Sequence, residues 1–132
     1  MTRRDIHFVW SIEMIGQWNL SALDCEDPQA LANFYRELTG LPIYADDPEW
    51  VELGMKGSYP HLAFQRVERH VPPNWPAAIN GQQAHLDIFV ADLAEAEAKV
   101  LALGAKLIDC DHRIYRVYLD PAGHPLCLVD QG

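Results

Sequence analysis

The chain has 132 residues, a size that fits one domain able to bury a core without disulfides or a structural metal. It carries 10 Lys plus Arg against 19 Asp plus Glu, and its net charge of -9 would repel phosphate backbones and anionic membranes. We therefore expect no nucleic-acid partner and no membrane partner. Three widely spaced cysteines do not form a disulfide framework, which favours a reducing compartment and predicts a cytoplasmic protein.

Residues 1–16 precede the main pattern and are interpreted as an N-terminal extension. Apolar residues alternate from Ile6 to Met14, as they would in an extra edge strand. Translation beginning at Met14 would instead make the earlier residues an appendage. The sequence leaves both interpretations open.

The next stretch predicts a strand over residues 18–24 and then a helix. Asp27 can supply an N-cap oxygen and Pro28 suits the first helical position, so a helix begins there. Apolar residues repeat at helical spacing until Gly40 and Pro42 end the helix. Three short strands are expected near residues 42–44, 50–55 and 61–67, with Asp, Pro, Gly and Ser marking the turns between them.

Residues 68–83 are rich in proline and carry no periodic pattern, which indicates a connector. The pattern of the first half then repeats over residues 84–131. A strand is expected at 85–90, a capping box at 92–95 begins a helix, and Gly104 ends it. Further strands are expected at 106–109, 114–119 and 126–130.

The two halves match at a fixed offset of 65 residues: Asp27 with Asp92, Leu38 with Leu103, and Ile43 with Ile108. Two copies of so long a period indicate a duplicated module rather than a solenoid. We therefore predict an α+β domain over residues 17–132, made of two tandem βαβββ modules at 17–67 (module one) and 84–131 (module two), with one helix per module. Pairing of the uncovered sheet faces would give a curved eight-stranded mixed sheet around a central pocket.

A set of linked motifs resembles the vicinal oxygen chelate superfamily (glyoxalase, bleomycin resistance protein and extradiol dioxygenase), and especially its glyoxalase-like domains. The motifs are Leu23-Asp24-Cys25-Glu26-Asp27-Pro28, Phe34-Tyr35, His85-Leu86-Asp87-Ile88, Leu103-Gly104-Ala105 and Asp120-Pro121-Ala122-Gly123. The resemblance covers about residues 17–130. It implies a pocket that in metal-dependent members holds a divalent ion, with His or Gln on a first strand and Glu on a last strand as usual ligands.

The resemblance places few of those ligands in this chain. His85 lies at the ligand position of the second module, seven residues before the Asp92 helix cap, but the equivalent residue before Asp27 is Leu20. Cys127 stands where metalloenzymes carry Glu.

In module one the equivalent of that last-strand Glu is Ala63 or Gln65. His85, Gln65 and Cys127 are thus weak metal candidates, with His61 or Asp87 as additional donors on the same faces. We predict no metal and no other cofactor, with a divalent metal as the alternative.

The candidate ligand-binding residues are His85, Asp87, Gln65, Cys127, His61 and Tyr118, and the catalytic candidates are His85 and Asp87. The Cys127 thiol is reactive if His85 or a helix terminus lowers its pKa, or else it is a small buried hydrophobe. One or two of four aromatic residues are expected in the pocket: Trp50, Trp75, Tyr115 and Tyr118. His112 and Arg113 are expected in solvent, and Glu95, Glu97 and Lys99 on an exposed helix face.

Three functions remain open at this point. The first is a metal-independent protein that binds or sequesters a small organic molecule, an antibiotic-like ligand being one option. The second is a divalent-metal-dependent lyase, isomerase or dioxygenase. The third is a metal-free enzyme in which His85 and Asp87 act as an acid-base pair. A homodimer is expected in each case, since the apolar sheet faces need cover.

Overall fold

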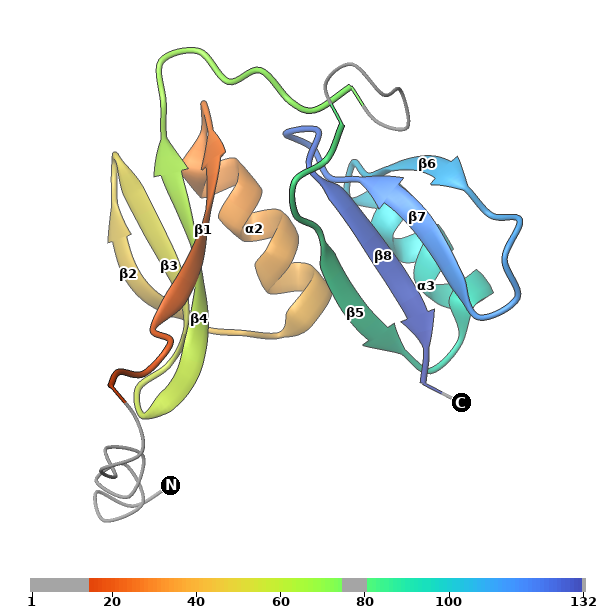
Figure 1. The fold of residues 1–132 in the computed structure, drawn as a ribbon, viewed down its shortest axis with the longest axis horizontal. Helices are drawn as coiled ribbons and strands as arrows, with labels where there is room; N and C mark the ends of the chain where they lie inside the picture. The colour runs from red at the N-terminus through yellow and green to blue at the C-terminus, as the bar shows by residue number, and fades with distance from the viewer. Residues whose placement is uncertain (1–14, 75–80, 132) are drawn as a thin grey trace. The chain divides into compact units, whose positions relative to one another are not determined.

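The computed structural model describes residues 15–74 and 81–131, so the strand expected at 6–14 and the side chain of Trp75 lie outside the described residues. The chain divides into two compact units, with the boundary between Glu68 and Arg69. Within the described residues, each unit contains one four-stranded mixed sheet and one helix (Figure 1). This confirms the α+β class and the two tandem βαβββ modules, module one in the first unit and module two in the second.

The sheet of the first unit has the strand order β1-β4-β3-β2. Its elements are β1 (Leu20–Cys25), α2 (Pro28–Thr39), β2 (Ile43–Asp47), β3 (Trp50–Met55) and β4 (Ser58–Arg66). The first and last strands of the unit, β1 and β4, pair in parallel, and the other pairs are antiparallel. The elements expected over residues 18–67 are all present, with β4 beginning three residues earlier than the pattern indicated.

Helix α2 begins and ends where the sequence predicts. The Asp27 carboxylate accepts a hydrogen bond from the backbone N–H of Ala30 at 3.1 Å, and Gly40 ends the helix with a φ of 75°. The apolar face of the helix packs on the sheet, where the ring of Tyr35 stacks on that of Phe64 at 5.4 Å. Both rings are fully buried, so they lie in the core of the first unit.

The sheet of the second unit repeats this topology, in the order β5-β8-β7-β6. Its elements are β5 (Leu86–Val90), α3 (Leu93–Ala102), β6 (Lys106–Asp109), β7 (Tyr115–Leu119) and β8 (Pro125–Asp130). Again the first and last strands pair in parallel. Asp92 caps α3 by accepting a hydrogen bond from the backbone N–H of Glu95 at 2.9 Å, which confirms the predicted capping position.

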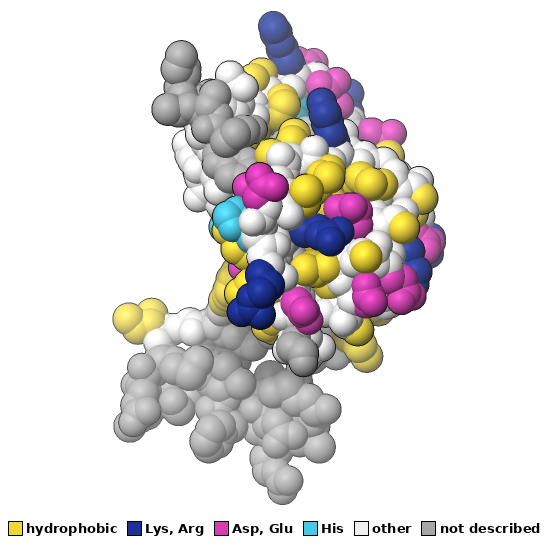
Figure 2. Space-filling view, turned by 90° about the vertical axis from the view of Figure 1, so that its right-hand side faces the viewer, with side chains coloured by type: hydrophobic (Ala, Val, Ile, Leu, Met, Phe, Trp, Pro, Cys, Tyr) yellow, Lys and Arg dark blue, Asp and Glu magenta, His cyan; other side chains and the backbone are white. Residues whose placement is uncertain are grey.

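Helix α3 is joined to its sheet by polar contacts that the sequence did not indicate. Glu97, expected on an exposed face with Glu95 and Lys99, instead accepts a hydrogen bond from the Tyr118 hydroxyl at 2.8 Å and pairs with Arg116 at 3.3 Å. The expectation was wrong for Glu97 because Tyr118 reaches it from β7. Glu95 and Lys99 do form an exposed i,i+4 pair. The face seen in Figure 2 mixes hydrophobic, acidic and basic side chains.

The described start of the expected connector packs on the turn before β8. The His70 Nε2–H donates to the carbonyl of Ala122 at 3.0 Å, and the His70 and His124 rings lie 4.7 Å apart. Gly123 has a φ of 90°, and a Cβ there would lie 2.6 Å from the Cβ of Pro72. Across residues 15–74 and 81–131, neither helix has the length and apolar character needed to cross a membrane.

Candidate functional site

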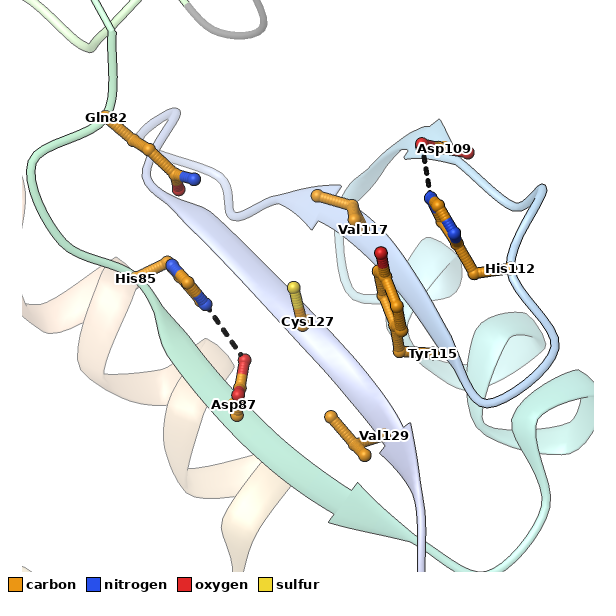
Figure 3. Close-up of a pocket in the computed structure, with 9 residues that line it drawn as sticks. All are labelled: Gln82, His85, Asp87, Asp109, His112, Tyr115, Val117, Cys127 and Val129. Atoms are coloured by element: carbon orange, nitrogen blue, oxygen red, sulfur yellow. Dashed lines mark hydrogen bonds and ion pairs between the residues drawn. The ribbon is translucent and has the colours of Figure 1, made fainter.

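A cavity of about 370 Å³ lies on the sheet of the second unit (Figure 3). On β8 the cavity is lined by Cys127 and Val129, whereas the alternate residues Leu126 and Leu128 are fully buried. Because successive side chains of a strand point to opposite faces, the cavity and the core occupy opposite faces of this sheet. The residues that line the cavity are Gln82, His85, Asp87, Asp109, His112, Tyr115, Val117, Cys127 and Val129.

His85 and Asp87 are in direct contact at the start of β5. The distance from His85 Nε2 to Asp87 Oδ1 is 3.1 Å, and Figure 3 shows the two side chains side by side. They share a face because they are two residues apart on an extended chain. Both are accessible, with 39% and 61% of their side-chain surface exposed, so the pair can reach a bound molecule without rearrangement.

Cys127 lies beside this pair, since β5 and β8 pair Asp87 with Cys127 in register. Burial, and then the charge and hydrogen bond of Asp87, raise the pKa of the Cys127 thiol to about 11. The thiol is therefore protonated at neutral pH. This contradicts the possibility of a reactive thiolate, because the nearest charged group that shifts the thiol is a carboxylate and not a cation.

A second His–Asp pair lines the same cavity. His112 Nε2 lies 3.1 Å from Asp109 Oδ2, and the His112 ring stacks on Tyr115 at 4.3 Å. The backbone N–H of Asp111, followed by His112, lowers the pKa of Asp109 despite partial desolvation. His112 is 41% exposed, as expected of a loop residue, yet it lines the cavity, which the sequence interpretation missed. The signal available was the Asp109-x-x-His112 spacing.

Gln82 contributes a polar atom that has no partner in the described part of the chain. Its side-chain oxygen Oε1 is buried and accepts no hydrogen bond. Figure 3 shows the side chain reaching from the segment before β5 toward the sheet. Gln82 falls in a stretch assigned to the connector, where no periodic pattern marks an inward-facing position.

The predicted site residues thus divide into two groups. The structure brings together His85, Asp87 and Cys127. Tyr118 does not line this cavity, because it is fully buried and its hydroxyl binds Glu97 on α3. Burial and then the Glu97 carboxylate raise the pKa of that hydroxyl.

The other two predicted residues lie on β4 of the first unit. Gln65 is exposed there. His61 is buried, and both of its ring nitrogens are occupied: Nε2–H donates to the carbonyl of Met55 at 2.8 Å, and Nδ1 lies 2.6 Å from a carboxylate oxygen of Glu52. The His61 ring also stacks on that of Tyr59 at 4.3 Å. These contacts give His61 a structural place within the first unit.

The donor atoms of the second unit allow a test of fit for a metal ion. His85, Asp87 and Cys127 can each offer one atom, and these atoms lie within 4.8 Å of one another. Strand pairing makes Ala63, and not Gln65, the counterpart of Cys127, because β1 pairs Ala22 with Ala63 as β5 pairs Asp87 with Cys127. The two remaining positions implied by the family are therefore poor, since neither Leu20 nor the buried Ala63 has a donor atom. Thiol and imidazole donors suit a soft ion such as zinc, whereas hard ions want several carboxylate oxygens. The residues form a possible ligand group that lacks half of the usual set.

Comparisons with known proteins agree with this architecture. A family model described as the glyoxalase-like domain matches residues 21–129. A glyoxalase/bleomycin resistance protein/dioxygenase family enzyme from Burkholderia phytofirmans PsJN is similar in structure, with a TM-score of 0.70 at 16% identity over 87% of this chain and 98% of that one. No curated protein sequence matches.

Two further solved structures show the same fold. A glyoxalase-related enzyme from Fulvimarina pelagi aligns with a TM-score of 0.62 at 22% identity, over 89% of each chain. Lactoylglutathione lyase from Agrobacterium tumefaciens aligns with a TM-score of 0.58 at 22% identity, over 88% of this chain and 94% of that one. Because the family model covers residues 21–129, most of the sequence, the chain belongs to the glyoxalase-like domain family.

Proposed function

We propose that the protein is a metal-independent member of this family that binds a small organic molecule in the cavity of the second unit. The observation that carries the proposal is the composition of that cavity. Val117 and Val129 supply an apolar floor, and hydrogen-bonding side chains from β5, β6 and the loop after it surround this floor. Ligand sites commonly combine an apolar lining with a few placed polar groups, in cavities of roughly 300–1,000 Å³.

Metal independence is supported by the chemistry of the donor set. Asp87 already pairs with His85 and accepts a hydrogen bond from the Cys127 thiol, so a metal ion would have to displace both interactions and the thiol proton. Leu20 and Ala63 offer nothing to compensate for that cost. We therefore expect hard ions to bind weakly to this group.

The first experiment measures metal content and metal response. Protein purified without chelator should contain well under one equivalent of metal, and Mn²⁺ or Mg²⁺ should barely change its melting temperature, since stabilisation follows RT ln(1 + [L]/Kd). The His85→Ala and Cys127→Ser variants should then respond no differently from the unmodified protein. Cys110→Ser is the matched control because Cys110 is an exposed free cysteine that does not line the cavity.

A second experiment addresses the organic ligand directly. Native mass spectrometry of the purified protein should reveal a bound small molecule. Fragments found by screening should form adducts in the same measurement, and in NMR titrations they should shift amide signals around the cavity. Replacing Val117 in the cavity floor by Phe should abolish those adducts by filling the space. If ligands bound equally well to the filled variant, the assignment of this cavity would fail.

A divalent-metal-dependent lyase, isomerase or dioxygenase is the alternative function, and it rests on the three donor atoms within 4.8 Å. Stoichiometric metal in the unmodified protein, lost in His85→Ala and in Cys127→Ser but kept in Cys110→Ser, would place this function first. The restored set Leu20→His with Cys127→Glu offers a positive control. It should gain metal affinity if these positions act together as they do in the family.

A further inference from the structure

The charged groups that line the cavity carry one sign. Two carboxylates, Asp87 and Asp109, face it, and no Lys or Arg is among its described lining residues. Each carboxylate has one imidazole partner, so even full protonation of both histidines would only bring the lining to neutrality. The net charge of -9 on the whole chain adds to the same field. A cavity of this kind repels anions and attracts cations.

Gln82 adds an independent demand for a hydrogen-bond donor. Its Oε1 atom is buried at the cavity and is unsatisfied within the described residues. A buried carbonyl oxygen without a partner is costly, and most such atoms in folded proteins have one. A ligand that carries an N–H or O–H group would satisfy this oxygen. An anion, which has only acceptors to offer, would not.

The remaining lining accommodates a ring. The Tyr115 and His112 rings stack with an interplanar angle of 12°, and Val117 and Val129 provide apolar surface beside them (Figure 3). A flat hydrophobic group can pack on this surface while a charged group at its end reaches toward Asp87 and Gln82. The cavity of about 370 Å³ holds a molecule of one or two rings.

We propose that the cavity is selective for a small organic cation, an aromatic molecule with a protonated primary amine. The ammonium group donates to Gln82 Oε1 and pairs with Asp87, and the ring packs on Tyr115 and the two valines. This inference rests on the proposed small-molecule function and adds the class of ligand. Charge-assisted hydrogen bonds of this type are the strong ones in proteins, so the charge dominates the selectivity.

Three probes with one ring and different charge test the inference: benzylamine, benzyl alcohol and benzoate. They are titrated into the ¹⁵N-labelled full chain at pH 7, and amide shifts report both affinity and location. We expect shifts around the cavity, with benzylamine bound about tenfold more tightly than benzyl alcohol and benzoate weakest, since a charged partner strengthens a hydrogen bond by about that factor. Added NaCl should lower the affinity for benzylamine and leave the affinity for benzyl alcohol unchanged.

Matched variants separate the two contacts. Asp87→Asn should weaken benzylamine about tenfold and leave benzyl alcohol within about threefold, whereas Asp111→Asn, an exposed acid outside the lining, should change neither. Gln82→Met removes the acceptor while keeping the length of the side chain. It should weaken the binding of both benzylamine and benzyl alcohol, which each carry a hydrogen-bond donor. Gln83→Met is its exposed control.

The outcomes distinguish this inference from the function beneath it. Benzoate binding in the cavity as tightly as benzylamine, or an unchanged benzylamine affinity in Asp87→Asn, would overturn the cation selectivity and leave small-molecule binding standing. Failure of all three probes to shift any amide around the cavity at millimolar concentration would count against both.

Discussion

The Cys127 thiol offers the sharpest prediction, because its environment opposes ionisation from two directions. Its pKa rises from an ordinary 9.0 to about 11, through burial first and then through Asp87. At pH 7 about 1% of an ordinary thiol is ionised, against about 0.01% of this one. The thiolate fraction is therefore about a hundredfold lower, but the thiolate of a thiol with a pKa raised this far is roughly tenfold more nucleophilic. The two effects together should make alkylation of Cys127 about tenfold slower than that of an ordinary thiol.

The assay is the rate of modification by iodoacetamide between pH 7 and 9, followed peptide by peptide in chelator-treated protein. Cys110 is exposed and serves as the internal reference. Asp87→Asn removes the electrostatic causes but leaves the burial, so the pKa should fall part of the way and the rate should rise about threefold. Asp46→Asn, an exposed acid of the first unit, is the matched control.

Two results would refute the reasoning. Cys127 modified at pH 7 as fast as Cys110 would mean that its thiol is not held protonated. An unchanged rate in Asp87→Asn would mean that the carboxylate does not act on the sulfur. Protection of Cys127 by added zinc, on the other hand, would support the metal-dependent alternative.

Three more predictions concern stability and assembly. Gly54→Ala should destabilise the protein by about 2 kcal/mol or more in chemical denaturation, because a Cβ there would lie 2.3 Å from the His61 ring and the backbone has a φ of 152°; a variant as stable as the parent would show that the ring can move aside. Tyr118→Phe removes the hydrogen bond to Glu97 and should cost about 1–2 kcal/mol by the same measurement, with no loss of ligand binding because the hydroxyl lies outside the cavity. Sedimentation should show a homodimer at micromolar concentration, since large apolar side chains such as Phe89, 69% exposed, need cover; a monomer at high micromolar concentration would contradict this.

The elements were predictable from the sequence because their signals are local. Asp27 and Asp92 cap helices through their own side chains and backbone groups a few residues away, and such chemistry can be recognised in a short window. The glycine that follows each helix acts just as locally. The fold class followed from repeating these signals twice.

The cavity was harder to predict because it depends on strand register. Val117 pairs with Cys127, which brings Tyr115 and Val117 to the cavity face and turns Tyr118 to the helix. The sequence of β7 does not show which of its faces pairs toward the cavity, so Tyr118 was chosen as a binding candidate although Tyr115 is the tyrosine that lines the cavity. Gln82 lies outside the regular elements, where periodicity says nothing about direction.

The two copies of the module differ in the residues at the positions of the cavity. By sequence offset and strand pairing, the counterparts of His85, Asp87 and Cys127 in the first unit are Leu20, Ala22 and Ala63.

The first unit instead buries its polar pair. His61 and Glu52 bond to each other, and both lie almost out of solvent. A polar pair that satisfies itself stabilises a sheet, whereas a half-exposed pair such as His85 and Asp87 keeps hydrogen-bonding capacity for a ligand. Under the proposed function, the first copy of the module uses its polar pair for stability and the second uses its pair for binding. We therefore predict that substitutions exchanging these polar residues move the binding capacity with them.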